Sequence, residues 1–223
     1  MKVELLNHTP LSVADIAICK CYGNTPHEDK YKVQARINRV ANVSKHASTI
    51  EHLSYSFDID GISRALLQEL ARHRIASYTV KSSRYTLQEL KKESHFYTPK
   101  LYHYEMLDDI QRKCLDGDIK RASEYIVLTG NKNIDYQSMK ALDNLREMIS
   151  FNVPNDLAKY CMPEAYKTSL VMTINARSLQ NFLELRSSKH ALWEIQELAK
   201  AMYDVIPDDH KFLYNIGEDD ANR

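Results

Sequence analysis

Glycine is scarce in this sequence, which has only five glycines among 223 residues. A Rossmann dinucleotide site needs a G-x-G-x-x-G turn and a P-loop needs G-x-x-x-x-G-K-[ST], because glycine lets the backbone approach a phosphate closely. The glycines stand at positions 23, 61, 117, 130 and 217 and complete neither pattern. The sequence therefore lacks both motifs, and any dinucleotide must be bound in another way.

Cysteine patterns and long apolar runs are missing as well. The four cysteines, at positions 19, 21, 114 and 161, form one C-x-C and two singletons, which is neither a disulfide framework nor paired C-x-x-C zinc spacing. No run of about eighteen apolar residues occurs, and the N-terminal residues lack the apolar centre of a secretory signal. We expect reduced, mostly buried thiols in a cytoplasmic protein that makes no membrane contact.

The spacing of histidines and acids predicts no metal site. His46, Glu51 and His52 lie close together in the sequence, but H-x-x-x-x-E-H is not zincin spacing. The zinc-deaminase pattern, H-x-E with P-C-x-x-C, is also missing. We therefore predict that the protein holds no metal ion.

Net charge is absent too, because 30 basic and 30 acidic residues balance. A general nucleic-acid or membrane-surface binder would normally carry a basic excess. Any anion-binding site in this chain must therefore be local. The length suits a single domain that spans residues 1–223.

The hydrophobic pattern predicts an α+β domain in which helices dominate. Strict alternation over 53–59 and a run of β-formers over 168–174 predict two strands. Helical spacing predicts further elements over 12–22, 31–45, 62–71 and 190–206, one after residue 86, one after residue 178, and two or three between 95 and 150. The fold class follows from this mixture rather than from any repeat.

Short sequence signals mark where these helices should begin and end. Each expected N-terminal cap is a serine or threonine whose hydroxyl can accept a free backbone N–H, in two cases with an acid three residues later. The expected caps are Ser12 with Asp15, Thr86 with Glu89, and Ser178, and Gly23 is expected to end the first helix.

The residues best suited to chemistry gather at 71–86, ARHRIASYTVKSSRYT. No carboxylate lies between Glu69 and Glu89, whereas seven hydroxyl side chains do. Guanidinium groups bind phosphate bidentately and hydroxyls fill its remaining lone pairs, so the segment suits a phosphorylated ligand. A solvated basic helix end that complements its own dipole is the alternative, and both interpretations remain open. The cationic-type residues are Arg72, His73, Arg74, Lys81 and Arg84.

Arg186 is a charge on an apolar helix face. It follows Leu179 by seven residues, Phe182 by four and Leu183 by three, so its stem shares their face. An unpaired buried charge is costly, which predicts either a neighbouring acid or an anionic ligand as its partner. A surface arginine whose stem covers apolar neighbours is the alternative.

Asn175 and Arg177 stand where a predicted strand gives way to this helix, and Asn181 lies about one turn further on. Such a junction presents free N–H groups and is a common docking place for anions. Together with Arg186 these residues form a second polar group, about a hundred residues after the first.

Two non-enzyme interpretations also fit these charges. One is that the basic and aromatic residues of this segment track a single-stranded nucleic acid and stack on its bases; they are Arg72, Arg74, Tyr78, Lys81, Arg84 and Tyr85. A structural oligomer with a buried ion-pair network is the other possibility.

The spacing Arg72-His73-Arg74, seven residues, then Ser82 resembles the R-H-R-x(7)-S signature of the flavin-dependent thymidylate synthases. The segments HASTIEH at 46–52, INARSLQNFLELRSS at 174–188 and HALWEIQELA at 190–199 are similar to other patterned segments of that family. They occur in the family's order, so the resemblance covers most of residues 35–206.

This resemblance implies a reductive methylation of dUMP to dTMP. Methylene-tetrahydrofolate would donate the carbon, and NADPH would reduce bound FAD, which serves as the hydride carrier. It also implies a mixed, mainly antiparallel sheet with helices packed around it, in a homotetramer whose active sites lie at subunit interfaces. Local basic pockets in a neutral chain would then serve to bind these anionic ligands.

The resemblance also implies roles for individual residues. Arg186 would hold the uracil edge, and Ser82 would bind dUMP first and act as a covalent catalyst only second, since no general base is evident beside it. The flavin contacts would be His46, Ser48, Glu51, Arg72, His73, Arg74, Asn175, Arg177 and Asn181; the dUMP contacts would be Gln68 or Glu69, Arg72, Ser82, Ser83, Arg84, Lys159 and Arg186.

The chain departs from the family pattern at three places. Val80 stands where many relatives have a glutamate, and Lys159 stands where they have a phosphate-binding arginine. Lysine keeps the charge but loses the bidentate fork. Glu69 replaces the usual nucleotide-contacting glutamine, with Gln68 beside it.

Overall fold

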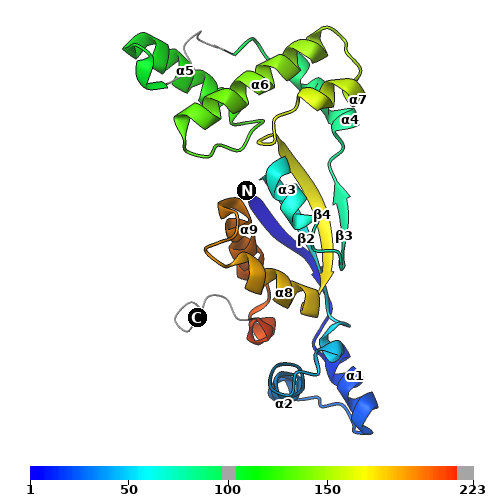
Figure 1. Ribbon diagram of the computed structural model, residues 1–223. Coiled ribbons are helices and arrows are strands. Elements are labelled where there is room, and N and C mark those ends of the chain that lie inside the picture. The colour runs from blue at the N-terminus through cyan, green and yellow to red at the C-terminus, as the bar shows by residue number, and fades with distance from the viewer. Residues whose placement is uncertain (97–103, 215–223) are drawn as a thin grey trace. The chain divides into compact units, whose positions relative to one another are not determined.

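The computed structural model describes residues 1–96 and 104–214. It contains helices and a four-stranded sheet with the strand order β1-β2-β4-β3, in which visible neighbours run in opposite directions (Figure 1). The α+β class and the mainly antiparallel sheet are thus confirmed. The strands are β1 (Lys2–His8), β2 (Ser54–Ser63), β3 (Ala76–Val80) and β4 (Lys167–Asn175).

Strand β2 shows why the alternation in the sequence was informative. Tyr55, Phe57 and Ile59 are fully buried, while Ser54, Ser56 and Asp58 between them are at least partly exposed. Successive side chains of a strand point to opposite faces, so this pattern buries one face. The predicted strands at 53–59 and 168–174 are both confirmed, with slightly longer bounds.

Strand β1 was not predicted. It pairs antiparallel with β2, with Lys2 opposite Asp60 and His8 opposite Tyr55, and its register shifts between Leu5 and Asn7. Such a shift breaks the period of two. The strand is also the exposed edge of the sheet, so its side chains carry little of the alternation on which the prediction depends.

The chain divides into two compact units. The first unit comprises 1–60, 68–79 and 169–223, and the second comprises 61–67 and 80–168. Helix α3 (Arg64–Leu70) contributes residues to both. The single domain spanning 1–223 stays a prediction.

The first unit contains most of the predicted helices outside the middle of the chain. The predicted helix at 31–45 is α2 followed directly by a π-helix over Asn38–Val43, and the last long helix is α9, which packs beside α8 and β1. The bounds are α1 (Ser12–Tyr22), α2 (Lys30–Ile37), α8 (Ala176–Arg186) and α9 (Trp193–Asp204), with 3₁₀ helices at Ala47–Ile50 and Asp208–Leu213.

The second unit is helical around its own apolar core. Phe96, Ile119, Met139, Leu142 and Ile149 are among its buried residues. The two or three helices predicted between 95 and 150 correspond to α5 and α6; residues 97–103 lie outside the described part. The bounds are α4 (Ser83–Thr86), α5 (Asp109–Ala122), α6 (Lys132–Ser150) and α7 (Asn155–Ala158), with 3₁₀ helices at Leu87–Lys92, Tyr104–Met106 and Lys159–Cys161.

For α1, the predicted N-terminal cap is wrong and the predicted C-terminal residue is confirmed. Leu11 precedes the helix and no side chain caps it. Asp15 is instead buried, where its carboxylate contacts Arg36 at 3.1 Å and accepts the backbone N–H of His27 at 3.0 Å. Gly23 ends the helix in the left-handed region, at φ 67°, as expected.

The predicted Thr86–Glu89 capping box is also wrong, although a 3₁₀ helix does begin at Leu87. The Thr86 hydroxyl donates to the carbonyl of Ser82 at 3.2 Å. Glu89 accepts the Tyr166 hydroxyl at 3.0 Å and lies 3.4 Å from the Lys81 ammonium. The Thr86 hydroxyl therefore bonds to the preceding turn, and a tertiary partner engages Glu89, so neither side chain caps the helix.

None of the helices within 1–96 and 104–214 is long and apolar enough to cross a membrane. Among the same residues, no group of three or more histidine, cysteine, aspartate or glutamate side chains is placed to hold a metal ion.

A buried histidine, His210, packs against β1 and β2 in the first unit. The His210 Nδ1 atom lies 2.7 Å from the Tyr55 hydroxyl, and the His8 ring meets the His210 ring edge-on at 5.0 Å. His210 is 1% exposed. Burial lowers its pKa from 6.5 to about 4, because the protonated ring loses hydration there.

The first prediction concerns stability against pH. The unfolded chain binds a proton at His210 below about pH 6.5, whereas the folded chain does so only near pH 4. The contribution of His210 is therefore complete above pH 6.5 and is lost as pH falls towards 4, by at most about 3 kcal/mol. Urea unfolding of wild type and His210→Gln at pH 7 and 5 measures it. The variant should lose less stability than wild type between these values; equal losses would contradict the assignment.

Candidate active site

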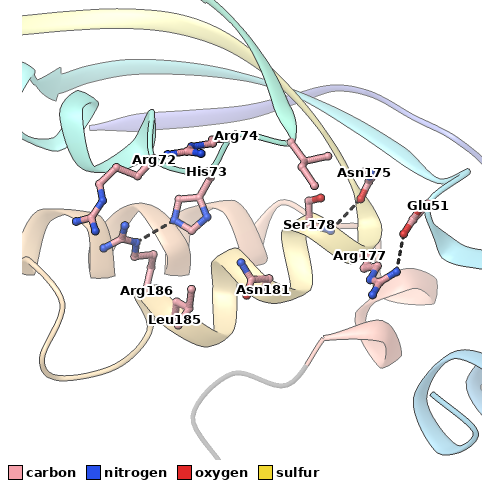
Figure 2. A pocket seen from close by; sticks show the side chains of 11 residues that line it. Glu51, Arg72, His73, Arg74, Asn175, Arg177, Ser178, Asn181, Leu185 and Arg186 are labelled. Carbon is pink, nitrogen blue, oxygen red and sulfur yellow. Dashed lines mark hydrogen bonds and ion pairs between the residues drawn. The ribbon is translucent and has the colours of Figure 1, made fainter. Parts of the chain in front are cut away.

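A cavity of about 730 Å³ lies in the first unit. Two segments far apart in the sequence form most of its lining: the turn after α3 and one side of α8. Figure 2 shows His73 of the first segment pointing towards Arg186 of the second. The lining residues are Glu51, Arg72, His73, Arg74, Ile75, Asn175, Arg177, Ser178, Asn181, Leu185 and Arg186.

Helix α8 begins at the cavity because Asn175 ends strand β4 and caps the helix. Its side-chain oxygen accepts the backbone N–H of Ser178 at 2.8 Å. Asn175 has extended backbone angles, whereas Ser178 already lies inside the helix. The prediction that Ser178 caps this helix is therefore wrong, since a cap precedes the N–H groups that it satisfies.

Arg186 lies at the last turn of α8 with its side chain 15% exposed. Its Nη1 atom is 3.0 Å from the Glu69 carboxylate, and Nη2 donates to the Glu69 carbonyl at 3.2 Å. The expectation of a neighbouring acid is confirmed, and the alternative of a surface arginine is wrong. The pair joins residues 117 apart in the sequence.

His73 accepts the third hydrogen bond of Arg186, from Nε to the His73 Nε2 atom at 2.9 Å. The ring packs edge-on against Phe182 at 4.9 Å. Burial lowers the pKa of His73, and the charges of Arg186 and Arg72 lower it further, while Glu69 acts in the opposite direction. Because arginine can only donate, the neutral ring carries its proton on Nδ1.

The other arginines of the cavity are more exposed. The Arg177 Nη1 atom lies 2.7 Å from the Glu51 carboxylate, and the Arg72 Nη1 atom lies 3.3 Å from Glu69. Within the described residues, Arg74 forms no ion pair. The residues that line the cavity include three arginines besides Arg186 but one carboxylate, Glu51, so the wall can accept an anion.

Two predicted flavin contacts do not line the cavity. His46 and Ser48 are both exposed, and the His46 Nδ1 atom lies 3.2 Å from the Tyr22 hydroxyl. Gln68 is exposed on α3 and does not line the cavity either. The structure thus brings together Glu51, Arg72–Arg74 and the whole second polar group, which is Asn175, Arg177, Asn181 and Arg186. His46, Ser48 and Gln68 lie outside the cavity lining.

The predicted dUMP contacts Ser82, Ser83, Arg84 and Lys159 belong to the second unit. The Arg84 carbonyl accepts the side-chain N–H of Asn155 at 2.7 Å, which joins α4 to α7. Arg84 also lines a separate open pocket of about 370 Å³. Lys159 is exposed, and its ammonium lies 5.9 Å from the centre of the Tyr160 ring.

Sequence reasoning missed the apolar part of the cavity wall. Ile75 is 72% exposed and Leu185 is 55% exposed, and both line the cavity. Large exposed apolar side chains beside arginines suit the flat face of a ring system. The available signal was position: Ile75 directly follows R-H-R, and Leu185 lies off the buried stripe of its helix.

Donors, charge and shape together define a class of site. Guanidinium and amide groups can bind phosphate or pyrophosphate oxygens, and the exposed apolar residues can cover a planar ring. The molecule is therefore an α+β protein in which side chains, rather than a glycine-rich loop, line a cavity suited to a nucleotide-like anion.

Comparison with known proteins identifies the family. The family model for thymidylate synthase complementing protein matches residues 4–209. The chain is 48% identical over 221 residues to a flavin-dependent thymidylate synthase from Wolinella succinogenes, covering 98% of this chain and 100% of that one. A second from Campylobacter jejuni is 50% identical over 216 residues, covering 96% of each.

A solved structure agrees with these sequence matches. The flavin-dependent thymidylate synthase from Helicobacter pylori, complexed with FAD and dUMP, superposes with a TM-score of 0.83 at 46% identity, covering 96% of this chain and 98% of that one. This chain belongs to the thymidylate synthase complementing protein family. The interpretation as a single-stranded nucleic-acid-binding module has no support from these matches.

The second prediction tests the start of α8. Asn175→Ala should lower the free energy of unfolding by about 1 kcal/mol, because it removes the cap. Ser178→Ala is the matched control and should change it by less than about 0.5 kcal/mol. Urea unfolding of both variants measures the difference. A larger loss in Ser178→Ala than in Asn175→Ala would restore the serine as the cap.

Proposed function

We propose that this protein is a flavin-dependent thymidylate synthase that converts dUMP to dTMP. Methylene-tetrahydrofolate is the carbon donor, NADPH is the reductant, and FAD is the bound cofactor. Family membership and relatives of that name near 50% identity over nearly the whole chain support this activity. The arginine-rich cavity beside α8 is the structural observation that carries it.

The cavity suits FAD in size and in chemistry. Its volume of about 730 Å³ lies within the usual range for small-molecule and cofactor sites. Arg72, Arg74 and Arg177 offer charged donors for a pyrophosphate, and Asn181 offers an amide. Ile75 and Leu185 offer apolar cover for a ring. When bound, FAD supplies hydride-transfer chemistry, while the protein supplies orientation and electrostatics.

Arg186 acts on the substrate in this proposal. Its guanidinium holds a carbonyl oxygen of the uracil ring and stabilises negative charge that develops there. A donor fixed in advance in a partly buried setting is effective because it need not reorganise during the reaction. The short contacts to Glu69 and His73 support such a fixed position.

The dUMP phosphate and sugar are assigned to Ser82, Ser83, Arg84 and Lys159, all of the second unit. These hydroxyl and cationic side chains suit a phosphate monoester, although Lys159 can form only single contacts where an arginine would form two. Ser82 is a binding residue in this assignment. No base is assigned to activate it.

We also propose a homotetramer with active sites at subunit interfaces. His46 and Ser48 are exposed and lie off the cavity, although they match flavin contacts of the family. Contacts from a second copy would give such residues a ligand to bind. Sedimentation of the purified protein tests the assembly.

The third prediction tests the activity itself. The purified protein should be yellow, NADPH without oxygen should bleach its absorption, and dTMP should form from dUMP. Arg186→Leu should fold and bind FAD but lose dUMP-dependent turnover by at least about 100-fold. Arg39→Leu, an exposed arginine outside the cavity, is the control. A colourless protein that refuses FAD and leaves dUMP unchanged would refute the function.

The same variant separates the enzyme from a structural ion-pair network. A purely structural Arg186 could be replaced by leucine with no loss, or even with a gain, of stability. An Arg186→Leu protein with full turnover and higher stability would support that alternative.

The fourth prediction concerns Ser82. Ser82→Ala should keep considerable turnover and raise the KM for dUMP, because it removes one hydrogen bond to the ligand. Steady-state kinetics and direct dUMP titration measure the two effects. Complete loss of turnover with dUMP affinity intact would make the serine a covalent catalyst instead.

A further inference from the structure

Arg186 has only part of its hydrogen-bonding capacity engaged by the protein. A guanidinium carries five N–H donors. Within the part of the chain that the structure describes, one goes to His73 Nε2 at 2.9 Å, one to the Glu69 carboxylate at 3.0 Å and one to the Glu69 carbonyl at 3.2 Å. Two donors remain, one on each terminal nitrogen, and Arg186 lines the cavity.

These contacts hold the guanidinium from two sides. The Glu69 carboxylate and carbonyl contact both terminal nitrogens, and His73 contacts Nε, so rotation about the end of the side chain would break all three bonds. A side chain ordered before its ligand arrives loses less conformational freedom on binding. Figure 2 shows the contact between Arg186 and His73 at the cavity wall.

The charge of Glu69 affects which ligand group the two remaining donors of Arg186 can bind. Glu69 compensates the charge of Arg186 and lies 3.3 Å from Arg72 as well. Arg74, in contrast, forms no ion pair within the described residues. A phosphate is therefore better placed near Arg74, and a neutral edge with carbonyl oxygens is better placed at Arg186.

We propose that Glu69 and His73 are positioning residues, which take up three donors of Arg186 and present the other two to the carbonyl edge of a pyrimidine. This rests on the proposed function, in which Arg186 holds the uracil ring of dUMP. Glu69 is thus assigned to the arginine rather than to direct contact with the nucleotide.

The arrangement requires a neutral His73. Protonation would place an N–H on Nε2 directly against the Nε–H of Arg186. The charged groups that face the ring are Arg72, Arg186 and Glu69, and the Phe182 ring covers it. Burial and the two arginines lower the pKa of His73, and Glu69 raises it. Removing the Glu69 charge should therefore lower this pKa further and move the acid limb of kcat/KM to lower pH.

The fifth prediction uses Glu69→Ala and Glu69→Gln in the FAD-loaded protein. Glu69→Ala should lower kcat/KM for dUMP by about tenfold, because the guanidinium loses its carboxylate partner and keeps only the contacts to the residue-69 carbonyl and His73, while FAD content stays unchanged. Glu69→Gln should keep most of the activity, because its amide oxygen still accepts from Nη1, but its acid limb should move to lower pH. Glu184→Ala is the matched control: Glu184 is exposed on α8 and does not line this cavity.

The outcomes separate the two proposals. An active wild type with Glu69→Ala within about twofold of it would refute the positioning role alone. A Glu69→Gln profile whose acid limb does not move would also refute it, because in this proposal the acid limb reports protonation of His73, whose pKa the Glu69 charge raises. This pH profile decides the matter if Glu69→Ala does not fold. A wild type that lacks FAD and does not act on dUMP would refute both proposals.

Discussion

A cation held on the apolar face of a helix is the constraint around which the site is built. Arg186 extends the stripe that buries Leu179, Phe182 and Leu183, and a charge in such surroundings needs partners. Glu69 supplies a carboxylate and a carbonyl, and His73 supplies a ring nitrogen. This cluster ties the last turn of α8 to the turn after α3, and thereby joins the two segments that line the cavity.

The sheet places these segments where they can meet. β4 ends at Asn175, whose side chain caps α8, and the Ala176 N–H donates to the Leu53 carbonyl at 2.8 Å, just before β2. The helix therefore starts at a point defined by hydrogen bonds at both its cap and its first residue. β2 leads into α3, which ends just before the R-H-R run. A chain without a glycine-rich loop can in this way assemble an anion site from side chains.

Local placement of charge also reconciles a neutral chain with anionic ligands. Basic residues with few acids line the cavity of the first unit, and hydroxyl and cationic side chains gather around Ser82 in the second. Acids elsewhere balance them. Glu51 in the cavity wall pairs with Arg177, and Glu69, which does not line the cavity, pairs with Arg186, so the pairing pattern, rather than net charge, distinguishes one arginine from another.

Periodicity and motif spacing are properties of the chain alone, and they were enough to predict the α+β class, the strands at 53–59 and 168–174, most helices and the R-H-R-x(7)-S signature. The sequence did not reveal β1, whose alternation is interrupted by a register shift at an exposed edge. Nor could it decide which side chain caps α8, or whether an acid or a ligand accompanies Arg186. The first choice depends on the backbone at the strand–helix junction, where Asn175 is extended and Ser178 is already helical. The second depends on groups 117 residues apart in the sequence, which only the folded chain brings within hydrogen-bonding distance.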